Sequence, residues 1–168
     1  MPRSLDYHST SQYSADEIYA TMVDLDYLRA RLVRLGGSRA ELLEHRADPD
    51  GARYQLRHGL SSADLPPLVT ALMAGDIVIE RTETLVREDV GRYAGNVSVD
   101  VRGTPASAAG SLRLVDLDGG GSELDVHADV TVNVPLIGGR IEATIAEQVK
   151  KLLAAETAFT LGWLGRGR

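Results

Sequence analysis

Three polar side chains stand on otherwise apolar stretches of this sequence and could do chemistry. His58 alternates with Tyr54 and Leu60 on one face of a predicted strand, and a histidine there can orient a polar ligand group or act as a general base. A hydrogen-bonded core histidine is the simpler alternative. Tyr93 could offer its hydroxyl, and Glu156 its carboxylate, to a ligand in the interior of the protein. Plain packing and the boundary of a helix face also account for these two residues.

A second pair of charges interrupts the predicted strand 76–88. Arg81 and Glu83 could point into the interior of the sheet. An ion pair on the solvent-facing side is the more ordinary arrangement for such residues, and it is the one expected here.

The familiar catalytic and metal-binding motifs are missing from the sequence. The histidines do not occur in HExxH or another metal-ligand spacing, and His127 falls on the polar face of a strand, where we expect it to be exposed. Serines occur without G-x-S-x-G, and glycine runs occur without a P-loop lysine or G-x-G-x-x-G. The sequence therefore predicts no catalytic residue set, no metal site and no cofactor.

Composition narrows the class of protein further. The chain has 168 residues, a formal net charge of −6 and no cysteine. An acidic surface opposes nonspecific binding to nucleic acid, whose phosphates attract basic proteins. The lack of cysteine fits a reducing compartment. The sequence shows neither an apolar N-terminal signal nor a long apolar run, so we expect a cytoplasmic protein with no integral membrane segment.

The N-terminal part predicts a short strand followed by two helices. Residues 3–10 alternate as a strand, and Ser14 with Glu17 forms a capping box for the first helix. Asp24 or Asp26 can cap a second helix, which glycines at 36–37 bring to an end.

Strands dominate the middle of the chain, and one long helix ends it. Strand patterns occupy 38–47, 52–61, 76–88, 91–103, 106–118 and 123–134, with turns at 48–51 and 119–121. The last strand alternates strictly, which indicates a sheet covered on one face only. From 140 to about 164, apolar residues recur at helical spacing over roughly 37 Å. This order predicts an α+β fold.

The junction between the last strand and the long helix contains residues that redirect a chain. Pro135 cannot donate to a strand ladder, and Gly138 and Gly139 can adopt backbone angles closed to other residues. Glu142 near the helix start favours the positive end of the helix dipole. The helix N-terminus could also bind an anion, although a turn alone explains these residues.

The junction V-N-V-P-L-I-G-G-R-I-E at 132–142 and the capped helix pair at 14–35 resemble the helix-grip (SRPBCC) superfamily. That superfamily includes START lipid-transfer domains, birch-pollen-allergen proteins and polyketide cyclase/dehydrase-like proteins. The chain looks like an uncharacterised bacterial branch of it. The resemblance implies a single domain over 1–168, in which a curved antiparallel sheet of about seven strands grips the C-terminal helix around a hydrophobic cavity.

The strand faces and the resemblance together place the candidate site. The residues expected to line the cavity are Tyr54, Leu56, His58, Leu60, Tyr93, Val97, Val99, Val126, Val130, Ile145, Val149, Leu152 and Glu156. The residues expected to form a lid are Leu65, Leu68, Leu72 and Met73.

Three functions remain open at this point. The first is non-enzymatic binding of a hydrophobic small molecule or lipid in the cavity. The second is a cyclase/dehydrase-type enzyme acting on a polyketide-like substrate, which needs a buried acid or base such as His58. The third is a ligand-free interaction module, which a solidly packed core would favour. The oligomeric state cannot be predicted from this sequence.

Overall fold

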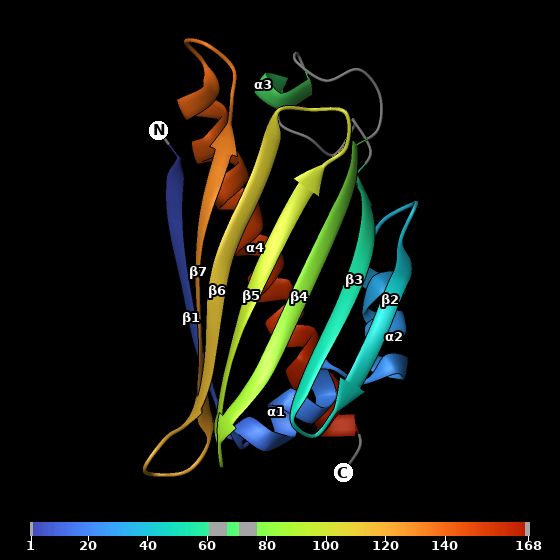
Figure 1. Ribbon diagram of the computed structural model, residues 1–168, viewed down its shortest axis with the longest axis vertical. Helices are drawn as coiled ribbons and strands as arrows, with labels where there is room; N and C mark the ends of the chain where they lie inside the picture. The colour runs from blue at the N-terminus through green and yellow to red at the C-terminus, as the bar shows by residue number, and fades with distance from the viewer. Residues whose placement is uncertain (1, 61–66, 71–76, 167–168) are drawn as a thin grey trace.

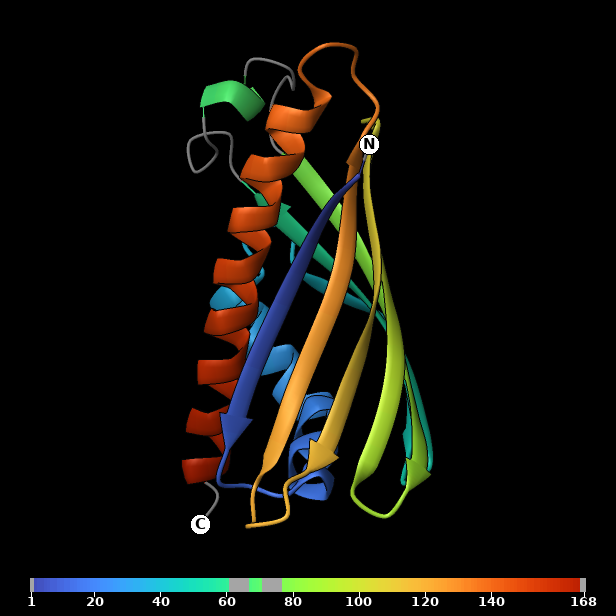
Figure 2. The same cartoon turned by 90° about the vertical axis from the view of Figure 1, so that its left-hand side faces the viewer.

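A computed structural model describes residues 2–60, 67–70 and 77–166 of the chain. Within these residues, a curved antiparallel sheet wraps partway around one long helix (Figures 1 and 2). The elements are β1 (Arg3–Ser11), α1 (Ala15–Met22), α2 (Leu25–Leu35), β2 (Glu41–Asp48), β3 (Gly51–Leu60), α3 (Pro67–Thr70), β4 (Ile77–Asp89), β5 (Arg92–Val101), β6 (Ala106–Asp116), β7 (Ser122–Val132) and α4 (Gly138–Arg166). The predicted order of elements and the α+β class are confirmed.

The sheet pairs the first strand of the chain with the last. Its seven described strands run in the order β1-β7-β6-β5-β4-β3-β2, so the first strand pairs with the last. In this pairing Leu5 lies opposite Ala128 and Tyr7 lies opposite Val126. Side chains of alternate residues therefore point together to the concave side, where α4 packs against β1 and β7 (Figure 2).

Helices α1 and α2 cover one end of the concave face. Ser14 accepts a hydrogen bond from the Glu17 amide at 3.1 Å, and Asp24 accepts one from the Tyr27 amide at 2.9 Å. Asp24, rather than Asp26, is therefore the cap of α2. Tyr27 then packs against Trp163 near the end of α4, with ring centroids 5.7 Å apart. This aromatic contact fixes the helix pair against the C-terminal half of α4.

The β7–α4 junction redirects the chain by a different route from the one predicted. The left-handed backbone belongs to Leu136, with φ of 73°, whereas Gly138 and Gly139 have no positive φ. Gly138 is required for space, because a Cβ there would lie 2.5 Å from the carbonyl oxygen of Val132. Buried Glu142 accepts a hydrogen bond from the Val132 amide at 2.8 Å, which ties the start of α4 to the end of the strand.

Candidate functional site: a cavity under the long helix

A cavity of about 230 Å³ lies between the concave face of the sheet and α4. Aliphatic side chains from β1, β5, β6, β7 and α4 form most of its wall. Val97, Val99, Ile145 and Val149 point inward but are only half-buried. Well-packed interiors leave few such gaps, so these side chains face a real internal space.

The structure brings most of the predicted cavity residues together. Those that line the cavity are His58, Leu60, Val97, Val99, Val126, Val130, Ile145, Val149, Leu152 and Glu156. Tyr54, Leu56 and Tyr93 share the same sheet face but are not among the lining residues. Tyr93 stacks on Tyr19 of α1 with centroids 4.2 Å apart, and its hydroxyl donates to Asp16. Helices α1 and α2 thus cover the part of the sheet where these three residues lie.

The predicted lid falls in the least described segment. Leu65, Leu72 and Met73 lie outside the described residues. Leu68 belongs to α3, but its side chain is not described either. The lid remains a prediction.

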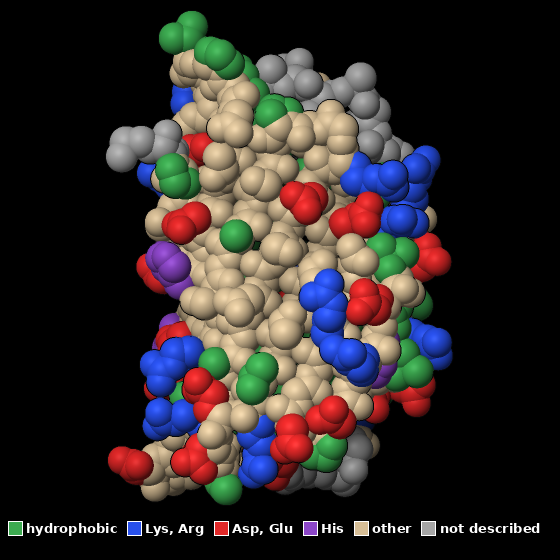
Figure 3. All heavy atoms as spheres, in the orientation of Figure 1, with side chains coloured by type: hydrophobic (Ala, Val, Ile, Leu, Met, Phe, Trp, Pro, Cys, Tyr) green, Lys and Arg blue, Asp and Glu red, His purple; other side chains and the backbone are tan. Residues whose placement is uncertain are grey.

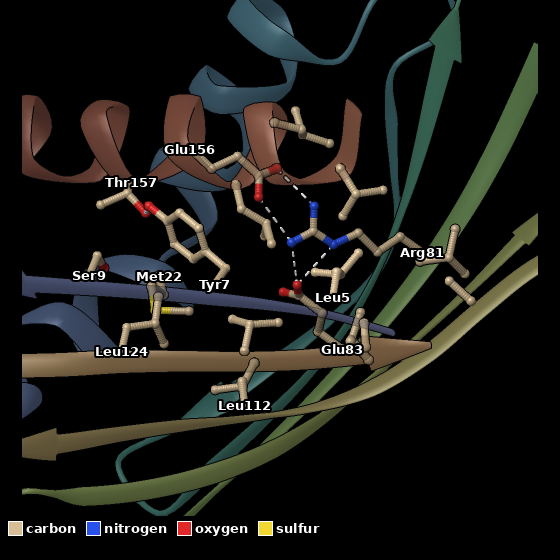
Figure 4. Close-up of a pocket in the computed structure, with 18 of the residues that line it drawn as sticks. Leu5, Tyr7, Ser9, Met22, Arg81, Glu83, Leu112, Leu124, Glu156 and Thr157 are labelled. Carbon is tan, nitrogen blue, oxygen red and sulfur yellow. Dashed lines mark hydrogen bonds and ion pairs between the residues drawn. The ribbon is translucent and has the colours of Figure 1, made fainter. Parts of the chain in front are cut away.

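A buried ion-pair network crosses the cavity from β4 to α4 (Figure 4). Arg81 donates through Nε to Glu83 Oε1 at 2.9 Å, and through Nη1 and Nη2 to the two carboxylate oxygens of Glu156 at 2.8 and 3.0 Å. The predicted solvent-facing ion pair is therefore wrong. Alternate residues of a strand point to the same face of the sheet. Arg81 and Glu83 alternate in step with buried Ile77 and Leu85, so the sequence pattern indicates that they point inward.

Arg31 of α2 joins this network and was not predicted. Its side chain is 4% exposed, its Nε lies 3.7 Å from Glu156 Oε2, and its guanidinium stands 5.6 Å from the ring centre of Tyr27. Arg31 follows Leu28 by three residues and precedes Leu35 by four, which places it on the apolar stripe of α2. That spacing is the sequence signal for its burial.

Burial and neighbouring charges set the ionisation of this cluster. Burial alone would raise the pKa of Glu156, but attraction to Arg31 and Arg81, with hydrogen bonds from Arg81, lowers it to about 2. The same two arginines outweigh burial at Glu83 and lower its pKa. Burial, with repulsion from Arg81, lowers the pKa of His58 to about 4. At neutral pH the cluster thus holds two cations, two anions and a neutral histidine.

Several buried polar atoms in this region have no hydrogen-bond partner in the part of the chain that the structure describes. On the cavity wall these atoms are Nε and Nη2 of Arg31, Oε2 of Glu83 and Nε2 of His58. The hydroxyl of Tyr54, behind the wall, also lacks a hydrogen bond of regular geometry, although it interacts with the carboxylate of Glu83 opposite it on the neighbouring strand. His58 is therefore buried as expected, but its Nε2 lacks the bond that a satisfied core histidine would make.

A separate polar cluster lies on the outer face, where β1 pairs with β7. Atoms of His8, Glu123 and Asp125 that could hold a metal ion lie within 4.8 Å of one another. His8 already contacts Asp125 at 2.6 Å, which explains the cluster as an exposed ion pair. His127 is exposed as predicted and contacts Asp6 at 2.8 Å. These pairs join residues more than 100 positions apart, so only the strand register reveals them.

Comparison with known proteins places the chain in a family. Residues 6–164 match the family model described as protein of unknown function (DUF2505). The chain belongs to this family. Its relatives include the uncharacterized proteins Rv0481c of Mycobacterium tuberculosis (strain H37Rv) and Mb0491c of Mycobacterium bovis. Each is 28% identical over 170 residues, which is 98% of both chains.

Solved structures share the fold of this DUF2505 chain at low sequence identity. A protein of unknown function from Staphylococcus aureus, SA2116, has a TM-score of 0.59 at 9% identity and covers 99% of this chain and 96% of its own. Ara h 8.0201 has a TM-score of 0.55 at 15% identity, with 96% and 99% covered. With the sheet and helix arrangement described above, these matches confirm the predicted helix-grip fold.

Proposed function

We propose that this protein binds a hydrophobic small molecule or lipid in the cavity under α4, without catalysing a reaction. The observation that carries the proposal is the internal space of about 230 Å³, whose wall is mainly aliphatic and includes the half-buried Val97, Val99 and Val149. An apolar ligand placed there would gain about 25 cal/mol for each Å² of apolar surface removed from water. Pockets for small hydrophobic ligands combine such a wall with a few polar groups, as this one does.

The enzyme alternative retains one candidate group. Tyr93 is bonded to Asp16, and burial with that bond raises its pKa to about 12. Glu156, held ionised by arginines, is too weak a base to take a proton near neutral pH. His58 is neutral there and has an unoccupied Nε2, so it is the residue to test for cyclase/dehydrase-type catalysis. Unchanged turnover in a His58→Ala variant would exclude it.

The interaction-module alternative needs a core that is packed solid. The cavity argues against it, because in a solidly packed core the residues that line this space would contact one another.

In the described residues, no helix is long and apolar enough to cross a membrane. A cytoplasmic location stays a prediction.

Native mass spectrometry of gently purified protein, followed by organic extraction, tests the proposal. A matched pair of variants locates the ligand: Ala108→Phe places a ring in the cavity, whereas Ala94→Phe places one on the opposite face of the same sheet. We expect a one-to-one hydrophobic adduct on wild type and on Ala94→Phe, and none on Ala108→Phe. A bare chain that also fails to bind an added apolar fluorescent probe would contradict the proposal.

A further inference from the structure

Three buried side chains with unmet hydrogen-bonding capacity face the apolar cavity. Arg31 is 4% exposed, Glu83 is 3% exposed and His58 is 6% exposed, and all three line the cavity wall. A buried polar group without a partner is unfavourable, and native interiors contain few of them. Three around one internal space indicate that something polar completes them.

The unmet groups include both hydrogen-bond donors and an acceptor. Arg31 Nε lies 3.7 Å from Glu156 Oε2, which is beyond hydrogen-bonding distance, and Nη2 beside it also lacks a partner within the described chain. Glu83 uses Oε1 to accept from Arg81, whereas its Oε2 makes no hydrogen bond of regular geometry within the described chain. The hydroxyl of Tyr54, opposite Glu83 on β3, interacts with this carboxylate and helps to lower its pKa, but it leaves Oε2 able to accept from a ligand. His58 Nε2 can donate or accept, depending on its tautomer. A group that can both accept and donate would satisfy this set.

The balance of charge restricts that group further. Arg31 and Arg81 are matched by Glu83 and Glu156, and His58 is neutral at neutral pH. A carboxylate or ammonium would add an unmatched charge to a buried, balanced cluster, which is strongly unfavourable. A hydroxyl is neutral and offers one donor and two acceptor positions.

We propose that the ligand is an amphiphile with a neutral hydroxyl head, which Arg31, His58 and Glu83 hold while its apolar body lies along the aliphatic wall. This inference rests on the proposed function and names the class of molecule for the same cavity. It assigns the ligand's orientation, with the head beside the ion-pair network and the tail between Val130 and Val149.

A competition assay with three simple ligands tests this inference. Decanol, undecane and decanoic acid each displace an apolar fluorescent probe at about pH 7, where the acid is ionised. The readout is the ratio of the undecane Kd to the decanol Kd, because differences in intrinsic hydrophobicity cancel when variants are compared by this ratio. We expect decanoic acid to bind wild type more weakly than decanol.

Two variants remove the proposed contacts without unbalancing the buried charges. The double variant Arg31→Met, Glu83→Gln deletes one cation and one anion, and His58→Phe touches no ion pair. We expect the Kd ratio to fall about tenfold in the double variant and about threefold in His58→Phe. Tyr7→Phe is the control, because its hydroxyl lines the same cavity but is bonded to Thr157 at 2.8 Å, and its ratio should not change.

The possible failures are distinguishable. An equal ratio in wild type and both variants would overturn the hydroxyl assignment while leaving a hydrophobic binder. Tightest binding of the ionised acid would overturn the neutral head group. Failure of wild type to bind all three ligands and the probe would overturn the proposed function itself.

Discussion

Two sets of ion pairs occupy opposite faces of the same sheet and have opposite surroundings. On the concave face, Arg81 joins Glu83 and Glu156 in a buried network. On the outer face, histidines pair with acids across β1 and β7, as His8 does with Asp125. Figure 3 shows this outer face, with histidine next to acidic side chains at the β1–β7 edge and charges of both signs elsewhere. The chemistry of the pairs is similar, but their access to water is not.

This difference determines what each set contributes. Water and salt screen the outer pairs, so each adds little to the free energy of unfolding. The inner charges have lost their hydration, and removing one leaves its partner buried and unpaired. Under the proposed function, the inner network serves specificity for a ligand rather than stability. Four changes test this contrast, from the largest expected effect to the smallest.

Glu156→Gln is expected to have the largest effect. It removes the carboxylate that pairs with Arg81 and lies near Arg31, which leaves two buried cations against Glu83 alone. We expect the free energy of unfolding to fall by about 3–5 kcal/mol, measured by urea denaturation. Glu147→Gln, an exposed position on the same helix, is the control and should change it by less than about 0.5 kcal/mol. Equal losses of unfolding free energy at both positions would show that the buried network contributes no more to stability than an exposed charge.

His58 should make the protein less stable as the pH falls. Burial, then repulsion from Arg81, lowers its pKa from 6.5 to about 4, so the unfolded chain binds the proton first. The stability that neutral His58 permits is complete above about pH 6.5 and is lost progressively down to about pH 4. The loss should be about 2–3 kcal/mol. Denaturation curves across this range should show a shallower dependence in His58→Phe, and an unchanged slope would contradict the assignment.

Two tyrosine hydroxyls allow a finer comparison of buried and partly buried bonds. Tyr27 shares a hydrogen bond with Thr160 at 2.5 Å in the buried core, whereas Tyr7 donates to Thr157 at 2.8 Å in a partly buried place. Tyr27→Phe should destabilise by about 1–2 kcal/mol and leave Thr160 unpaired on that side. Tyr7→Phe should have a smaller effect in the same thermal unfolding assay. The reverse order would mean that burial does not control these bonds.

The outer histidines should show the smallest effect and the opposite pH dependence. The hydrogen bond that His127 Nδ1 donates to the Asp6 carboxylate raises the pKa of His127 above 6.5, so the charged pair stabilises the fold below that pH. This contribution is lost as the pH rises through the raised pKa. Asp6→Asn should lower the pKa of His127 toward 6.5, which histidine NMR titration can measure. A pKa that does not move would show that the pair is not formed in solution.

The fold could be predicted well from the sequence because its signals are local. Strict alternation defines β7, and the Ser14 capping box defines the start of α1. The alternation of residues along β4 also predicts that Arg81 points inward, whereas the usual exposure of charged side chains predicts the opposite. The position of a polar group within the interior is not a local property, since Arg31 meets Glu156 only when α2 packs against α4.

The boundaries of the site were harder to predict for the same reason. Tyr93 lies on the predicted inward face, yet α1 covers it and removes it from the cavity wall. Strand patterns identify a face of a sheet, but they do not indicate which part of that face a helix covers. The outer His8–Asp125 pair likewise depends on the register of β1 against β7, which no short-range pattern contains.

The central claim is that a hydrophobic ligand enters the cavity between the sheet and α4, and methyl NMR tests it most directly. Decanol would be titrated into protein labelled at its valine and leucine methyl groups. We predict saturable shifts at the wall residues Leu5, Val130 and Val149, with none at Val33 and Val90, which are 88% and 75% exposed. Shifts confined to the exposed methyl groups, or no shifts at all, would contradict the account.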